Sequence, residues 1–100
     1  MFDQLKKMFG GEDFAALVKG GAQVIDVRSR EEFASGHLNG SVNIPLPELN
    51  RSLGRIRKDK AIIVCCASGM RSSSAKAMLE SHGFTVYNGG GWRSLERKVS

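Results

Sequence analysis

Short apolar runs alternate along this chain with segments whose apolar positions recur every three or four residues. The runs have strand length and are rich in β-branched residues, which predicts four strands, at residues 22–27, 41–44, 61–65 and 84–87. The helical spacing predicts helices at residues 2–9, 12–19, 30–34, 47–53, 72–82 and 92–99. Because strands and helices alternate, the pattern indicates an α/β domain whose central sheet is mostly parallel.

The run at 61–65 is the most apolar in the chain. Being apolar on both faces, it is typical of a central strand that helices cover on either side. The helical positions predicted to pack on the sheet are Phe14, Leu17, Val18, Leu49, Leu53, Ala75, Met78 and Leu79. Ser29 and Glu32 have the spacing of a capping box, which predicts that they begin the helix at 30–34.

Length and cysteine content narrow the class of protein. The 100 residues suffice for one domain, which we assign to residues 12–100, with residues 1–11 as an N-terminal extension. Cys65 and Cys66 are neighbours, and a disulfide between them would strain the peptide unit that joins them. No spacing resembles a zinc site, and no secretory signal or membrane-spanning run is seen. We therefore expect a cytoplasmic protein with reduced thiols and no metal or cofactor.

The chain is basic, with a formal charge of +5 at pH 7. Its Lys and Arg residues gather at 51–60 and 93–98. No aromatic residues interleave with these charges, and no nucleic-acid-binding motif appears. We interpret both segments as solvent-exposed faces and expect no nucleic-acid or membrane partner. A positive field also favours small anionic substrates.

The most reactive part of the chain is predicted to follow the central strand. In open α/β sheets, ligands bind beyond the carboxyl ends of the strands, where loops lead into helices. Cys66 opens such a loop, Gly69 permits a close backbone turn, and Arg71 adds a positive charge. The amides of the loop and of the helix N-terminus can form a nest for an anion. A thiol placed there should have a lowered pKa and be a thiolate near neutral pH.

The two cysteines are expected to differ in role. Cys65 continues the strand and should point into the core, as buried structural cysteines commonly do. Cys66 is the candidate nucleophile, able to take sulfur from a donor, hold it as a persulfide and pass it to an acceptor.

Three ordered motifs resemble those of the rhodanese family. The pattern Cys-x-x-Gly-x-Arg is carried here by Cys66, Gly69 and Arg71. Residues 25–45 are similar to the family's Asp-x-Arg, Glu-Phe, Gly-His-Ile-x-Gly-Ala and Asn-Ile-Pro, with Leu38 and Ser41 in place of Ile and Ala. The third motif is Gly83-Phe84 to Tyr87, followed by Gly89-Gly90. The resemblance spans about residues 12–97, and the spacing from the glycines to Trp92 is shorter than the family often has.

The resemblance implies a rhodanese-like three-layer α/β domain with helices on both faces of the sheet. It implies a single-domain sulfurtransferase in which Cys66 forms the persulfide, cradled by the amides of Ala67, Ser68, Gly69, Met70 and Arg71. Arg71 would help bind the anionic donor or shape the loop. The donor would be thiosulfate or a persulfide such as glutathione persulfide. The acceptor would be cyanide, a thiol, or a protein such as thioredoxin.

Other polar residues of the motifs are expected to be structural. Asp26 should tie loops together at a strand end, and Arg28 should pair with Glu31 or Glu32. His37 is expected to stabilise a turn, and Trp92 to be a core or lid residue.

Three other functions stay open on sequence alone. A phosphatase or arsenate reductase would use the Cys-x5-Arg spacing from Cys65 to Arg71, although Cys65 belongs to the strand. A non-catalytic rhodanese-like interaction module generally lacks the cysteine that is present here. A redox-sensing thiol is the third, since an exposed cysteine of low pKa is readily oxidised.

Overall fold

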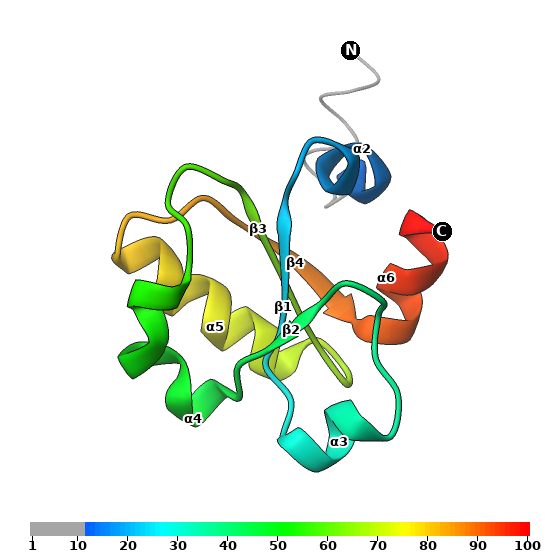
Figure 1. The fold of residues 1–100 in the computed structure, drawn as a ribbon, viewed down its shortest axis with the longest axis horizontal. Helices are drawn as coiled ribbons and strands as arrows, with labels where there is room; N and C mark the ends of the chain where they lie inside the picture. The colour runs from blue at the N-terminus through cyan, green and yellow to red at the C-terminus, as the bar shows by residue number, and fades with distance from the viewer. Residues whose placement is uncertain (1–11) are drawn as a thin grey trace.

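The computed structural model describes residues 12–100 as one parallel sheet with helices on both faces (Figure 1). Its strands are β1 (Gln23–Asp26), β2 (Val42–Asn43), β3 (Ile62–Cys66) and β4 (Val86–Gly91), in the spatial order β2-β1-β3-β4. The predicted three-layer α/β class is therefore confirmed. The helix predicted at 2–9 lies outside the described residues.

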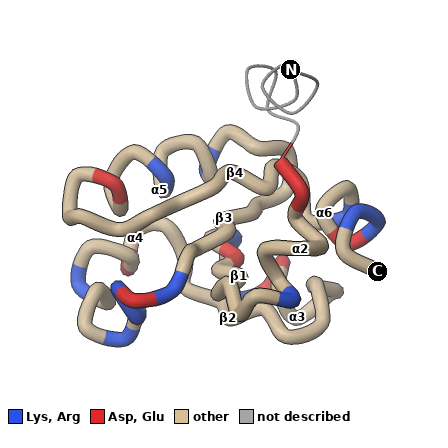
Figure 2. The backbone as a smooth tube through the Cα atoms, turned by 90° about the horizontal axis from the view of Figure 1, so that it is seen from above, with Lys and Arg blue, Asp and Glu red and all other residues tan. Residues whose placement is uncertain are grey.

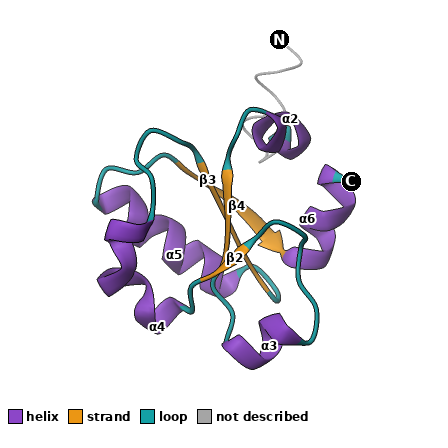
Figure 3. Cartoon of the chain, in the orientation of Figure 1, coloured by secondary structure: helices purple, strands orange, loops and turns teal. Residues whose placement is uncertain are grey.

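The helices agree with the sequence prediction except at some ends (Figure 3). They are α2 (Phe14–Lys19), α3 (Arg30–Ala34), α4 (Leu46–Leu49), α5 (Met70–Ser81) and α6 (Trp92–Val99). The side chain of Asp13 accepts a hydrogen bond from the Ala16 amide at 3.0 Å, so α2 begins after Asp13 and not at residue 12. The predicted capping box of Ser29 and Glu32 is present at the start of α3.

The helix predicted at 47–53 is instead two short pieces. Pro47 lies in the first turn of α4, which ends at Leu49, and the 3-10 helix η1 (Asn50–Arg55) follows. Asn, Ser and Gly within η1 are weak helix formers, and a 3-10 helix is the usual form of such short pieces.

The side chains of β3 alternate between two buried cores. The α5-side core contains Ile62, Val64 and Cys66, and includes Ala75 and Leu79 of α5. The α6-side core contains the other β3 residues and joins them to α2 and α6; its buried members are Phe14, Val24, Leu38, Ile63, Cys65 and Leu95. In Figure 1, α5 and α4 accordingly lie on one side of the sheet and α2 and α6 on the other.

The segment from Asn88 to Gly91, predicted to be a turn, belongs to β4. The pairing of β4 with β3 shifts register between Val64 and Cys65, so Gly90 and Gly91 lie beside the two cysteines. Gly89 is buried where the strand passes close to both β3 and α6. The glycines therefore allow a close approach of backbones at the end of the sheet.

Gly89→Ala is expected to destabilise the domain by about 1–3 kcal/mol, because the added methyl group overpacks the core. Its Cβ would lie 2.9 Å from side-chain carbons of Ile63 and Leu95 and 3.1 Å from the Val64 carbonyl oxygen. Gly54→Ala is the control, since no atom lies within 4 Å of that position. Urea unfolding midpoints of the two variants measure the effect, and equal midpoints would contradict the close packing.

Charged residues spread over the surface, with Lys and Arg positions near α4 and on α6 at opposite ends of the molecule in Figure 2. Several are paired or packed on rings: Arg57 contacts Asp59 at 2.7 Å, and Lys58 lies over the ring of Phe84. This arrangement agrees with solvent-exposed faces. Among residues 12–100, no helix combines the length and the apolar character that crossing a membrane requires.

Candidate active site

The turn that joins β3 to α5 is shorter than the sequence predicted. Cys66 is the last residue of β3 and not the first of a loop, and α5 begins at Met70 and not at Ser72. Only residues 67–69 form the turn, so Met70 and Arg71 belong to the first helical turn. Gly69 caps α5 with a φ of 103°, a left-handed conformation that strains other residues.

The sulfur of Cys66 lies under this turn and accepts hydrogen bonds from it. The amide of Gly69 donates to Sγ at 2.9 Å, and the amide of Ser72 donates to it at 3.4 Å. The Ser72 hydroxyl oxygen is also 3.4 Å from the sulfur. Cys66 is buried, whereas the turn residues Ala67 and Ser68 are exposed. A sulfur donor therefore has to approach from the solvent side of the turn.

These contacts decide the ionisation of Cys66. Burial is the largest single influence on its pKa and raises it, because the thiolate loses solvation. The hydroxyl and amide of Ser72, together with the amides of Gly69 and Ser68, stabilise the thiolate and outweigh the burial. The pKa of Cys66 is therefore lowered from its usual value, as the sequence predicted.

Ser72 is the contact that the sequence prediction missed. It is buried, and while Cys66 is a thiol its hydroxyl can donate to the Gly69 carbonyl at 3.0 Å or to Oδ1 of Asn88 at 2.7 Å. When Cys66 is a thiolate, the same hydrogen can turn to the sulfur. The Gly90 amide donates to the same Asn88 oxygen at 2.9 Å, which joins the end of β4 to the active turn. The signal available in the sequence was the position of Ser72, six residues after Cys66 and at the start of the predicted helix at 72–82.

Ser72→Ala is expected to raise the pKa of Cys66, because the variant loses the hydroxyl that stabilises the thiolate and keeps the burial that opposes it. The rate of alkylation by iodoacetamide, measured against pH, should then rise at a higher pH than in the parent protein. Ser74→Ala, two residues along α5 and exposed, is the control. An unchanged alkylation profile in Ser72→Ala would contradict the role of this hydroxyl.

Cys65 points to the other face of the sheet, into the α6-side core. Burial, followed by the negative charge of Asp26, raises its pKa to about 12. Cys65 is thus a buried neutral thiol, as predicted. The Cys-x5-Arg spacing that a phosphatase would use begins at a side chain facing away from the active turn.

Arg71 is held by a carboxylate of α3. Its Nη1 and Nη2 donate to Oε1 and Oε2 of Glu32 at 2.7 and 2.9 Å, and both side chains are little more than one-third exposed. Glu32 also accepts from the Ser29 amide at 3.1 Å in the capping box. The pairing places α3 beside the active turn, as Figure 1 shows. Met70, between Gly69 and Arg71, is 80% exposed.

Arg28 pairs with Asp26, which corrects the prediction that it would pair with Glu31 or Glu32. Its Nη2 donates to Oδ2 of Asp26 at 2.8 Å, and both residues are buried. Its Nη1 donates to the backbone carbonyl of Glu32 at 3.2 Å, and its Nη2 donates to that of Gly36 at 2.7 Å. The Arg28–Asp26 pair therefore ties α3 and the segment after it to the end of β1, in agreement with the structural role expected for it.

His37 and Trp92 also have structural contacts. The Nδ1 atom of His37 lies 2.7 Å from the Phe33 carbonyl oxygen, and the His37 ring stacks on that of Phe33 with centroids 3.7 Å apart. Trp92 packs on the α6-side core, with the Arg28 guanidinium 4.9 Å from its ring centroid.

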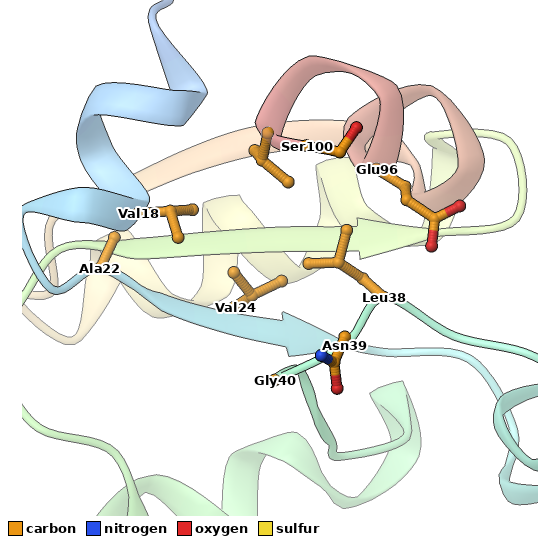
Figure 4. Close-up of a pocket in the computed structure, with 9 residues that line it drawn as sticks. Val18, Ala22, Val24, Leu38, Asn39, Gly40, Glu96 and Ser100 are labelled. Atoms are coloured by element: carbon orange, nitrogen blue, oxygen red, sulfur yellow. The ribbon is translucent and has the colours of Figure 1, made fainter.

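A hollow of about 340 Å³ lies elsewhere, between α2, α6 and the segment before β2 (Figure 4). Its walls are mainly apolar and include Val18, Val24, Leu38 and Val99. No residue of the active turn lines it. Within residues 12–100, no three His, Cys, Asp or Glu side chains gather as a metal site would require.

Comparisons with known proteins agree with this arrangement. The sequence model of a protein family, the rhodanese-like domain, matches residues 2–98 of this chain. The uncharacterized protein YqhL of Bacillus subtilis is 37% identical over 98 residues, which is 96% of this chain and 77% of its own length. The thiosulfate sulfurtransferase GlpE of Pseudomonas aeruginosa is 35% identical over 88% of this chain and 81% of its own. The structure of a rhodanese with anions from E. coli has a TM-score of 0.69 and 32% identity, covering 74% of this chain and 91% of that one.

Proposed function

The chain belongs to the rhodanese-like domain family, and we propose that it moves sulfane sulfur from thiosulfate or a persulfide donor to a thiophilic acceptor through Cys66. The observation that carries the proposal is the sulfur of Cys66 at the end of β3, where two amides donate to it and its pKa is lowered. Relatives named thiosulfate sulfurtransferase support it.

The first half-reaction loads the enzyme with sulfur. The Cys66 thiolate attacks the outer sulfur of thiosulfate, a new S–S bond forms, and the S–S bond of thiosulfate breaks with release of sulfite. The product is the Cys66 persulfide, whose terminal sulfur carries one negative charge. The amides of the turn and of the start of α5 can stabilise that charge, as they stabilise the thiolate.

The second half-reaction returns the enzyme to its starting state. A nucleophilic acceptor attacks the terminal sulfur, and the Cys66 thiolate leaves with the electron pair of the broken S–S bond. Cyanide, a low-molecular-weight thiol or a protein thiol, such as that of a thioredoxin, has the required nucleophilicity. We further propose a reducing, cytoplasmic setting, which would keep both cysteines free.

The rival functions receive less support. A phosphatase or arsenate reductase would need Cys65 as its nucleophile, but burial raises the pKa of Cys65 to about 12 and its side chain lies in the α6-side core. A non-catalytic interaction module would not require a thiolate-stabilising turn around Cys66.

Intact mass spectrometry tests the proposal. The reduced protein is incubated with thiosulfate, and we expect its mass to rise by one sulfur atom. Cyanide should then remove that sulfur and yield thiocyanate. A protein that gains no sulfur from thiosulfate, from cysteine persulfide or from glutathione persulfide would contradict the proposal and favour an interaction module.

A further inference from the structure

We propose that Glu32 sets the donor preference of the active site, by occupying Arg71 and so favouring alkyl persulfides over dianionic thiosulfate. The inference rests on the proposed sulfur transfer through Cys66. It concerns a residue that comes from α3, outside the active turn, and that the reaction itself does not require.

The two terminal nitrogens of Arg71 are already bound to Glu32. A guanidinium recognises an oxyanion with two parallel N–H groups, and Glu32 already fills that fork at 2.7 and 2.9 Å. Arg71 lowers the pKa of Glu32 to about 2, with a smaller contribution from the Ser29 amide. Glu32 is therefore ionised throughout the pH range in which the reaction runs, and the pair has no net charge.

The Glu32–Arg71 ion pair lies beside the turn that the donor has to approach. Arg71 is in the first turn of α5, directly after the turn that covers Cys66. Both members of the pair remain more than one-third exposed, so a ligand can contact them. An incoming donor therefore meets a neutral ion pair, and not a free cation.

The two donor classes respond differently to this arrangement. Thiosulfate carries two negative charges, so it gains from Arg71 only if it displaces the Glu32 carboxylate, and it gains little from the neutral pair if it does not. An alkyl persulfide reacts as the neutral R–S–SH group. The Cys66 thiolate attacks its outer sulfur, the S–S bond breaks, and R–S⁻ leaves with the charge. No additional cation is needed for that reaction.

Glu32→Gln removes the negative charge of residue 32 and keeps the fold of α3. Glutamine serves in a capping box as well as glutamate, so α3 keeps its bond to the Ser29 amide. Its neutral amide cannot form the ionic fork, which frees Arg71. Glu31→Gln is the matched control, because it removes the same charge from the adjacent, exposed position of α3.

Steady-state kinetics with thiosulfate and with cysteine persulfide test the inference. In Glu32→Gln, the KM for thiosulfate should fall about tenfold, the effect expected from one charge-assisted hydrogen bond, with kcat little changed. The KM for cysteine persulfide should stay within about twofold, and Glu31→Gln should resemble the parent protein with both donors. A rise in the thiosulfate KM of Glu32→Gln would overturn the inference, because Glu32 would then only position Arg71. Equal effects in the two variants would overturn it as well.

A second variant removes both charges of the pair. Glu32→Gln combined with Arg71→Gln removes the cation that the single variant frees, so its thiosulfate KM should be about tenfold above that of Glu32→Gln. A thiosulfate KM as low as that of Glu32→Gln would show that the gain does not come from Arg71, and would overturn the inference. If the parent itself accepts sulfur from neither donor, the proposed function fails instead.

Discussion

Replacing Cys66 with serine is expected to lower kcat/KM for sulfur transfer at least about a thousandfold, because a serine hydroxyl can neither ionise near neutral pH nor form a persulfide. Release of sulfite from thiosulfate, or formation of thiocyanate with cyanide, measures the loss. Intact mass should show no sulfur gain in this variant. Activity within tenfold of the parent would exclude Cys66 as the sulfur carrier.

Cys65→Ser is the matched control, since it makes the same atomic change one residue earlier. Its hydroxyl would be buried in the α6-side core, so some stability should be lost. At a temperature where the variant is folded, sulfur transfer should stay within about threefold of the parent. If Cys65→Ser abolished activity and the parent hydrolysed phosphate esters, the phosphatase interpretation would be correct.

The second large effect is expected from Asp26→Asn, which should lower the free energy of unfolding by about 3–5 kcal/mol. Asp26 is 0% exposed and Arg28 4% exposed, so the change leaves a buried guanidinium without its counter-charge. That loss is large beside the total stability of a small domain, about 5–15 kcal/mol. Urea or thermal unfolding followed by circular dichroism measures it.

Asp59→Asn provides the comparison for Asp26→Asn. The Arg57–Asp59 pair has the same chemistry, but both side chains are more than 60% exposed, and solvent screens their attraction. The unfolding midpoint of Asp59→Asn should therefore match that of the parent. Equal unfolding midpoints in Asp26→Asn and Asp59→Asn would mean that the buried Arg28–Asp26 pair contributes no more to stability than the exposed Arg57–Asp59 pair.

Local patterns were enough to predict the centre of the molecule. The run at 61–65 is the central strand, and the capping box of Ser29 and Glu32 begins α3 as expected. Cys65 lies in the core, as predicted, because it continues this apolar strand. These features depend only on residues that are close together in the sequence, so the sequence alone predicts them.

The parts that sequence reasoning missed depend on residues far apart in the chain. Arg71 and Glu32 are brought together only when α3 folds against the start of α5. Asn88 contacts Ser72 because β4 continues through a glycine run that resembles a turn when considered alone. The close contact of Gly89 with β3 and α6 explains that run, and it cannot be detected without the fold.

The opposite orientations of Cys65 and Cys66 also matter for chemical labelling. Maleimides and similar electrophiles react with thiolates, and only one of these two adjacent sulfurs is readily ionised, because the pKa of Cys66 is lowered while that of Cys65 is raised to about 12. The native sequence therefore accepts a single fluorophore or mass tag at a defined atom, with neither cysteine removed. Such a tag blocks the atom that would carry sulfur, so a sample labelled to completion should take up no sulfur from thiosulfate.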